Sequence, residues 1–299
     1  MAVEIRTAMI DDASAVAVLN QALFPYVAKT DEQFRHELQR AADDPARALL
    51  TAWSEGRLVG YASTVPATWR SLPGAFYQTL FVDKDFRGRG IGSELMQRAD
   101  AHLAEYDAYE VEAAPNDDGL SFALSRGYRV DSEMRYAGVD LRALPPEPER
   151  PAGIEVVPMF ELDAEAVFPA YQESGQDIPA TPVVASYEWF QQVVWESPSV
   201  APEFSYAAVD GGRVVCCTIS LRAATALWTD MTGTVRSHRG RGLARVVKWA
   251  ALRAAADAGL TAAYTANSEA NQPMLAVNRW LGYHPVAKHT VVRRTLRVR

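Results

Sequence analysis

The sequence is poor in cysteine and histidine, with two cysteines and five histidines in 299 residues. Cys216 and Cys217 are neighbours, and neighbouring residues of a strand point to opposite faces of a sheet, so the two pair poorly as a disulfide. The histidines are scattered and show no spacing typical of a metal site. These absences exclude a fold held together by disulfides and predict that the protein binds no metal ion. They also favour a location in the reducing cytoplasm.

The sequence also lacks a long apolar run. No stretch approaches the roughly 18 apolar residues that a membrane span requires. The first residues, MAVEIRTAMIDDAS, carry acids where a signal peptide has a basic region and an apolar core. We therefore expect a soluble cytoplasmic protein with no membrane partner.

An excess of positive charge is missing as well, because the net charge is −7 and the pI is about 5.4. Proteins that bind nucleic acids usually have a basic surface, so we expect no nucleic-acid partner. An acidic surface mildly favours cationic or neutral small molecules. Hydrophobic residues make up 48% and charged residues 22% of the chain, which excludes a largely disordered protein.

Proline is concentrated near the middle of the chain. Residues 144–153, LPPEPERPAG, contain four prolines. Proline donates no backbone hydrogen bond and prefers extended structure, as in linkers. This segment predicts an N-terminal domain at 1–143, a linker at 144–153 and a C-terminal domain at 154–299.

The two halves repeat each other. The run RGRGIG begins at Arg87 and RGRGLA begins at Arg239, 152 positions later, and a helical pattern follows each run. The tetrapeptide SRGY at 125–128 corresponds to WLGY at 280–283, with glycines 155 positions apart. Landmarks in the same order at nearly the same spacing indicate a tandem duplication.

The expected secondary structure repeats too. Each half opens with a strand (3–7; 154–158), continues with helical segments (12–24 and 32–42; 162–172) and has three further strands (48–53, 58–66 and 75–82; 204–209, 214–221 and 226–235). After the Gly-rich helix come another strand (109–113; 262–266), a short helix and a final strand (129–140; 286–296). This order predicts an α/β fold of the α+β type, with two mixed, mainly antiparallel sheets flanked by helices.

Each Gly-rich run lies between a strand and a helix. Glycines let backbone N–H groups converge, and the helix N-terminus adds positive potential, so the run forms a cradle for pyrophosphate. A solvated loop is the alternative interpretation. The dinucleotide-binding pattern requires an early strand, and the P-loop requires a Gly-Lys-Ser/Thr triplet, so neither describes these runs.

At these residues the sequence resembles the GNAT superfamily of acyl-CoA N-acyltransferases. Both runs fit the family's acyl-CoA signature, Q/R-x-x-G-x-G/A, between the fourth strand and the third helix. The segment SFALSRGY at 121–128 is similar to the family's second signature, a short helix ending in Gly-Phe/Tyr. The string NSEANQPMLAVNRWLGY at 267–283 looks like that of tandem GNAT proteins, the mycothiol synthase-like group.

The resemblance implies an acetyltransferase that moves an acetyl group from acetyl-CoA to an amine of a small-molecule or peptide acceptor by direct attack. It implies acetyl-CoA as co-substrate. The acid Asp230, which has no counterpart on the fourth strand of the first half, favours chemistry mainly in the C-terminal domain. Polyamines, amino sugars, amino-acid derivatives, antibiotics and protein N-termini remain open as acceptors. The alternative is a catalytically silent acyl-CoA-binding sensor or scaffold. We expect a pseudo-symmetric monomer.

The resemblance also implies where acetyl-CoA binds: along the fourth strand, at the Gly-rich turn, and near the asparagines of the last motif. The residues are Leu80, Phe81, Val82, Arg87, Gly88, Arg89, Gly90, Ile91, Gly92, Thr232, Gly233, Thr234, Arg239, Gly240, Arg241, Gly242, Leu243, Ala244, Asn267 and Asn271.

Attack on a thioester requires a neutral amine and therefore a base. Asp230 is the leading candidate, because an acid is unusual in an otherwise apolar and hydroxylic strand and burial would raise its pKa. A solvated acid at a strand edge is the alternative. Many GNAT enzymes place a tyrosine four residues before the glycine of the second signature, but here Ala123 and Asn278 occupy that position. Asn278 is the second catalytic candidate, to orient a water or the thiol, with helix packing as the alternative.

Three further acid or base candidates are weaker. His238 precedes the second Gly-rich turn, where a solvated position on the phosphate side is favoured over a base. Glu110 and Glu112 alternate on one face of a strand in the first half, a pattern more typical of a solvated face than of a base.

The acceptor is expected against the segment that follows the first helix of the second half. Asp177, Tyr187 and Trp228 are the candidate substrate residues, since a carboxylate and aromatic faces both favour a cationic amine. For Tyr187 the alternative is an amphipathic helix that buries it together with Phe190 and Val194.

Overall fold

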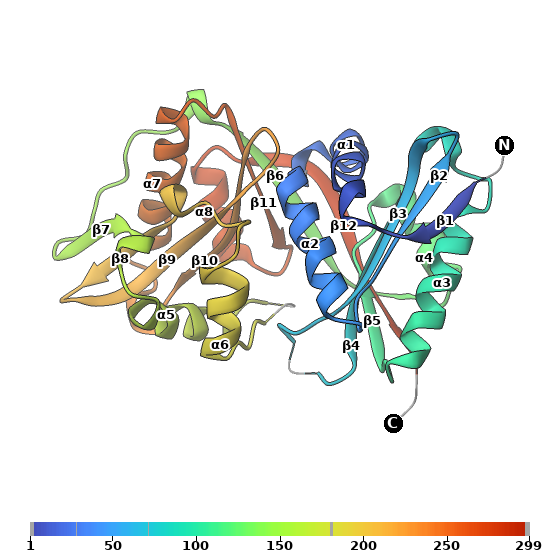
Figure 1. The fold of residues 1–299 in the computed structure, drawn as a ribbon. Helices are drawn as coiled ribbons and strands as arrows, with labels where there is room; N and C mark the ends of the chain where they lie inside the picture. Colours follow the sequence, from blue (N-terminus) through green and yellow to red (C-terminus); the bar gives the residue numbers. More distant parts are fainter. Residues whose placement is uncertain (1–2, 28, 71, 180–181, 297–299) are drawn as a thin grey trace. The chain divides into compact units, whose positions relative to one another are not determined.

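The computed structural model describes residues 3–27, 29–70, 72–179 and 182–296. Its contacts divide the chain into two compact units (Figure 1). The first unit comprises Met1–Glu133 and His289–Arg299, and the second comprises Met134–Lys288. Each unit is a mixed sheet with helices on both faces, so the predicted fold class is confirmed.

The sheet of the first unit has the order β1-β2-β3-β4-β5-β12. Its strands are β1 (Glu4–Thr7), β2 (Ala48–Ser54), β3 (Arg57–Pro66), β4 (Ala75–Val82), β5 (Glu110–Ala113) and the end of β12 (His284–Thr295). Its helices are α1 (Ala13–Leu23), α2 (Asp31–Asp43), α3 (Ile91–Glu105) and α4 (Asp117–Leu124). Because side chains alternate along β4, Phe81 joins the core cluster under α1 and α2, and Val82 joins the cluster under α3.

The sheet of the second unit has the order β6-β11-β10-β9-β8-β7. Its strands are β6 (Arg129–Asp140), β7 (Ile154–Pro158), β8 (Tyr206–Asp210), β9 (Arg213–Arg222), β10 (Leu227–Thr234) and β11 (Ala262–Ser268). Its helices are α5 (Ala164–Gln176), α6 (Tyr187–Phe190), α7 (Leu243–Asp257) and α8 (Gln272–Trp280). These bounds repeat the element order of the first unit.

The final strand of each half completes the sheet of the other half. β6, from the first half, pairs antiparallel with β11, with Asp140 opposite Ala262. β12, from the second half, pairs antiparallel with β5, with Thr295 opposite Glu110. The compact units therefore differ from the linear division expected at 144–153, and that segment lies within the second unit. A fifth strand without this partner would leave an open sheet edge, which exchange of the last strands covers.

This exchange predicts that a cut in the linker will not separate the halves. A protease site inserted within 144–153 should yield two fragments that elute together from a sizing column under native conditions, since each unit needs a strand from each fragment. Residues 154–299 expressed alone should aggregate, because β11 then lacks β6. Recovery of two separately folded, soluble fragments would contradict the exchange.

Candidate functional site

Both Gly-rich turns place glycines in the left-handed region of backbone space. In the second unit Gly240 and Gly242 have φ of +78° and +80°, and in the first unit Gly88 and Gly90 have φ of +74° and +85°. Gly90 and Gly242 immediately precede helices of 15 residues. A Cβ placed on any of these four glycines would meet nothing within 4 Å, so both turns face open space. A ligand phosphate can therefore approach the backbone of the turn and the helix N-terminus.

The first arginine of each turn ties it to the end of the preceding strand. Arg87 Nε donates to the Val82 carbonyl at 3.2 Å, and Arg239 Nε donates to the Thr234 carbonyl at 3.0 Å. These two contacts occupy the same place in the repeat. Each arginine therefore fixes the turn against the fourth strand of its unit.

Asp177, predicted to contact the acceptor, instead holds arginines beside the second Gly-rich turn. Its two oxygens accept hydrogen bonds from Arg236 at 2.6 and 2.8 Å, and Arg239 donates to it at 2.7 Å. These contacts hold the pKa of Asp177 well below its usual value. The carboxylate is thus committed to the turn and is not presented to an acceptor.

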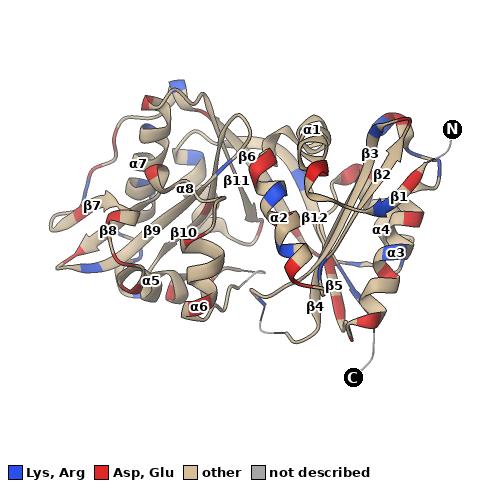
Figure 2. Cartoon of the chain, in the orientation of Figure 1, with Lys and Arg blue, Asp and Glu red and all other residues tan. Residues whose placement is uncertain are grey.

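A second carboxylate, Asp210, lies on the other side of the same turn. It accepts a hydrogen bond from Arg241 at 3.2 Å and lies 3.2 Å from His238 Nε2. His238 Nδ1 is 2.8 Å from the hydroxyl of Ser237. His238 therefore lies between Ser237 and Asp210 beside the second Gly-rich turn. Figure 2 shows such acidic and basic residues interspersed along both units.

The fourth and fifth strands part in both units. In the first unit the parallel pairing runs from Ala75 to Gln78 of β4, and in the second it covers only Leu227 and Trp228 of β10. The residues expected to pair with the pantetheine arm lie beyond these points, at 80–82 and 232–234. Each unit therefore has a gap between the ends of its fourth and fifth strands.

The two fourth strands differ at a β-bulge. On β10, Thr229 lies opposite Ser220 and Met231 opposite Ile219, so Asp230 is an extra residue without a partner on β9. β4 pairs with β3 in continuous register from Phe76 to Val82. A bulge interrupts the hydrogen-bond ladder and redirects a side chain. This one lies just after the point where β10 leaves β11.

The carboxyl of Asp230 lies beside an aromatic ring. Trp228 Nε1 donates to Asp230 Oδ1 at 3.1 Å. Asp230 is open to solvent on one side, and the protein around the remainder of the carboxyl removes water and raises its pKa. The hydrogen bond from Trp228 opposes this shift. Such a carboxyl is suited to exchange protons with a bound substrate.

A buried polar chain, which the sequence analysis missed, joins α7 to α8 and β11. Lys248 is 1% exposed, and its Nζ donates to Asn278 Oδ1 at 2.7 Å. Asn278 Nδ2 in turn donates to Asn267 Oδ1 at 2.6 Å. Burial lowers the pKa of Lys248 to about 7. The ammonium lies 5.0 Å from the ring centroid of Tyr283, and no carboxylate forms an ion pair with it within the described residues.

The first unit is apolar at the corresponding positions. Met96 lies 152 residues before Lys248, and Ala123 occupies the place of Asn278; both are buried. Within the part of the chain that the structure describes, only the second unit therefore combines the bulge and its carboxyl with this buried polar chain.

Residues 15–128 match the model of the acetyltransferase (GNAT) family. That part of the chain is similar to the GNAT family. None of the curated proteins compared matches this sequence.

Solved structures extend the likeness to the whole chain. A tandem GNAT protein from the clavulanic acid biosynthesis pathway is 21% identical, with 100% of each chain covered and a TM-score of 0.76. A GCN5-related N-acetyltransferase from Sphaerobacter thermophilus is 20% identical, covering 99% of this chain and 96% of the other, also with a TM-score of 0.76. A putative acetyltransferase from Pyrococcus horikoshii is 13% identical, with coverage of 99% and 90% and a TM-score of 0.62. The chain has the tandem GNAT fold, as predicted.

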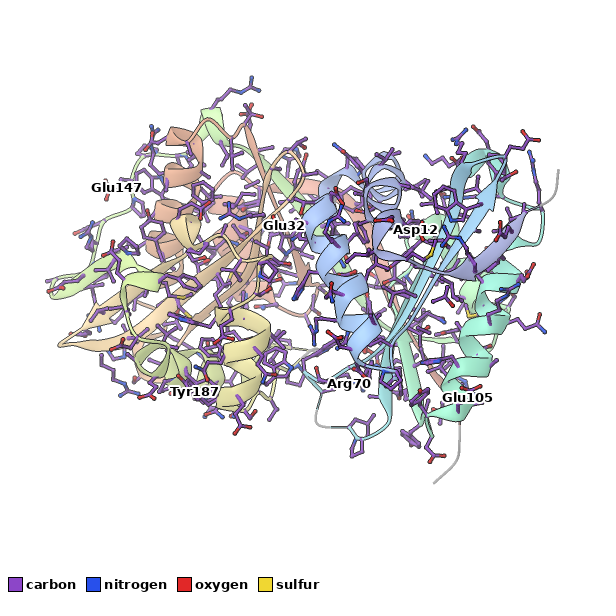
Figure 3. The ribbon with its side chains drawn as sticks, in the orientation of Figure 1. Asp12, Glu32, Arg70, Glu105, Glu147 and Tyr187 are labelled. Carbon is purple, nitrogen blue, oxygen red and sulfur yellow. The ribbon has the colours of Figure 1, made fainter. Side chains whose placement is uncertain are left out.

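Other predicted residues have local partners. Thr232 Oγ1 lies 2.8 Å from Thr218 Oγ1, and Asn271 caps α8 by accepting from the Met274 N–H at 3.3 Å. Tyr187, at the start of α6 (Figure 3), packs edge-on against Phe168 with 5.3 Å between ring centroids. Its neighbours Phe190 and Val194 are buried. These contacts match the alternative of a helix packed on the core.

Glu110 and Glu112 do not form a solvated face, so that interpretation was wrong. Glu112 is buried and receives a hydrogen bond from Arg293 at 2.9 Å. Arg70, labelled in Figure 3, donates to Glu110 at 2.7 Å. The strand pattern predicts that the two carboxylates share a face but not that arginines from a loop and from β12 cover it.

Within residues 3–27, 29–70, 72–179 and 182–296, no group of three or more His, Cys, Asp or Glu side chains is placed to hold a metal ion. None of the helices there has the length and apolar character to cross a membrane.

The buried amine of Lys248 predicts a pH-dependent stability. The native state releases its proton near pH 7, whereas the unfolded chain holds it up to about pH 10.5, so the penalty for burying the charge shrinks as pH rises between these values. The free energy of unfolding should increase by about 2–3 kcal/mol between pH 7.5 and 9.5 relative to Lys248→Met, the residue that the first unit carries. Urea unfolding of both proteins at the two pH values measures this, and parallel pH dependence would contradict it.

Proposed function

We propose that this protein is a cytoplasmic acetyltransferase that moves an acetyl group from acetyl-CoA to an amine of a small-molecule or peptide acceptor, with the chemistry in the second unit. The observation that carries the proposal is the bulge at Asp230, which puts a carboxyl of raised pKa where β10 and β11 part. The GNAT match of residues 15–128 supports acyl transfer in general.

The second unit fits acetyl-CoA. The open left-handed turn at Gly240 and Gly242 would receive the pyrophosphate, with backbone N–H groups from the start of α7. The backbone of β10 at 232–234 no longer pairs with β11 and would be available to the pantetheine arm. When bound, acetyl-CoA supplies the activated acetyl group.

Asp230 would take the proton that the acceptor loses. An acceptor ammonium gives one proton to the carboxylate, and the neutral nitrogen attacks the thioester carbonyl carbon. The C–N bond forms, the C–S bond breaks, and its electron pair remains on sulfur as a thiolate that takes up a proton. A backbone N–H released by the bulge would stabilise the developing oxyanion.

Asn278 would orient a water or the thiol on the leaving-group side, in place of the tyrosine that many GNAT enzymes use. Its amide is already fixed, because Lys248 donates to its oxygen and its own nitrogen donates to Asn267. Lys248 would thus be a positioning residue that acts through Asn278.

An acyl-CoA-binding sensor or scaffold remains the second candidate, and the first unit favours it. That unit keeps the open glycine turn but has a regular β4 and an apolar pair, Met96 and Ala123, where the second unit has Lys248 and Asn278. The likeness to mycothiol synthase stays a prediction.

Thiol release from acetyl-CoA, measured against a panel of amines, tests the proposal. We expect release that depends on the amine and yields the acetylated amine in equal amount by mass spectrometry. Tight acetyl-CoA binding without release for any amine in the panel would favour the sensor.

A further inference from the structure

Three aromatic side chains share one face of the second sheet. Trp228 on β10 lies beside Tyr264 on β11, and Tyr136 on β6 is the partner of Ala266 on β11. In the sequence, Leu227 precedes Trp228, Ala263 precedes Tyr264, and Ala137 follows Tyr136. These three neighbours are buried in the core cluster that also contains residues of α7. Because side chains alternate along a strand, the three rings lie on the opposite face.

The three rings line one wall, and two of them are in contact. The ring centroids of Tyr136 and Trp228 are 5.9 Å apart at an interplanar angle of 45°. They meet across β11, where the small side chain of Ala266 leaves room. Tyr264 lies close over Gly138, since a Cβ on that glycine would come within 2.8 Å of its ring. All three aromatic side chains are partly exposed, so a ligand can reach them.

Asp230 belongs to the same wall. Its Oδ1 accepts the indole N–H of Trp228 at 3.1 Å. This contact places the carboxyl with Trp228 on the face of the sheet opposite α7, and α5 packs against β10. The carboxyl and the rings therefore face the same space.

The carboxylate of Asp230 has no cationic partner within the described part of the chain. Other carboxylates of this unit do: Asp177 pairs with Arg236 and Arg239, and Asp210 pairs with Arg241. Among the residues that the structure describes, the hydrogen bond to Asp230 comes from Trp228, which is neutral. A lone carboxylate beside aromatic faces attracts a cation, because the faces carry negative quadrupole potential.

We propose that Trp228, Tyr264, Tyr136 and Asp230 form a cage for an organic ammonium group, so that the acceptor is an alkylammonium compound. This deepens the proposed function and rests on it for the identity of the ligand as acceptor. A carboxylate next to the amine would be repelled by Asp230, so simple alkylamines should be preferred to α-amino acids. Asp230 would first pair with the ammonium and then take its proton.

Binding of a charged probe and its neutral isostere tests the cage without catalysis. Choline and 3,3-dimethylbutan-1-ol have nearly the same shape, but only choline is a cation. Calorimetry should show choline binding roughly 10-fold or more tightly. Trp228→Leu and Asp230→Asn should each remove that preference, whereas Trp228→Phe, which keeps a ring, should retain part of it.

Trp249→Leu is the matched control, because this tryptophan lies on α7 and donates to the Pro145 carbonyl. It should leave choline affinity unchanged, and thermal unfolding followed by circular dichroism verifies that each variant is folded. Equal affinity for choline and its isostere would overturn the cage. So would a choline affinity that survives both Trp228→Leu and Asp230→Asn in folded protein.

The acyl-transfer assay separates this inference from the proposed function. Acetylation of anionic or neutral acceptors with no inhibition by choline would overturn the cage and leave the acetyltransferase in place. Choline-selective binding without thiol release for any amine would support the cage and count against the enzyme. Choline-selective binding together with preferred acetylation of alkylamines would support both.

Discussion

Asp230→Asn is expected to lower turnover roughly 10²–10⁴-fold, the usual contribution of one general base. The substitution keeps size and shape but removes the group that accepts the proton. Affinity for acetyl-CoA should remain almost unchanged, because the donor is expected at the turn and along 232–234, not at the carboxyl. Steady-state kinetics and calorimetry measure the two quantities separately.

The pH profile gives a second signature of the same role. Nearby protein atoms displace part of the water around the carboxyl and raise the pKa of Asp230 above its usual value of 3.8, so activity should rise with pH through a limb that lies above 3.8. This limb should be absent in Asp230→Asn. Asp257→Asn, a change of the same chemistry at an exposed residue that pairs with Arg253, is the control and should keep both rate and profile. An Asp230→Asn enzyme with the parent's rate and profile would refute the assignment and direct attention to His238.

Gly242→Val should abolish acyl-CoA binding to the second unit, and Gly90→Val should abolish it in the first unit alone. Each glycine has a left-handed φ directly before a long helix, and a branched side chain there both strains the backbone and fills the space the pyrophosphate needs. Calorimetric stoichiometry is the measurement, and unchanged stoichiometry in both variants would contradict the prediction.

A control variant must distinguish the effect of backbone strain from the effect of filling the phosphate site. Gly259 provides the control, because its φ is +88° and a Cβ there also meets nothing within 4 Å, yet it follows the opposite end of α7. Gly259→Val should lose a similar stability, about 1–2 kcal/mol, and retain acyl-CoA binding. Equal loss of binding in Gly242→Val and Gly259→Val would show that strain, not the turn, is responsible.

Some features of the site were visible in the sequence without being recognised. The repeat aligns Lys248 with Met96, which belongs to the apolar pattern of its helix. A lysine at a position that is apolar in the other half indicates a buried amine. Tyr136 and Tyr264 gave no comparable signal, because aromatic residues are common in strands. Asp177 looked like a substrate residue because its arginine partners, Arg236 and Arg239, are about 60 positions away.

The sequence by itself determined the repeat, the order of helices and strands, the glycine turns and the fold class. These features depend on residues within one or two turns of each other: alternation along strands, helical periodicity and the freedom of glycine at Gly90 and Gly242. Only the tertiary structure decided which strand completes which sheet, that Asp230 is the extra residue of a bulge, and that Asp177 serves the turn. Each of these depends on hydrogen-bond register or charge pairing between segments far apart in the chain, and local patterns are compatible with more than one such pairing.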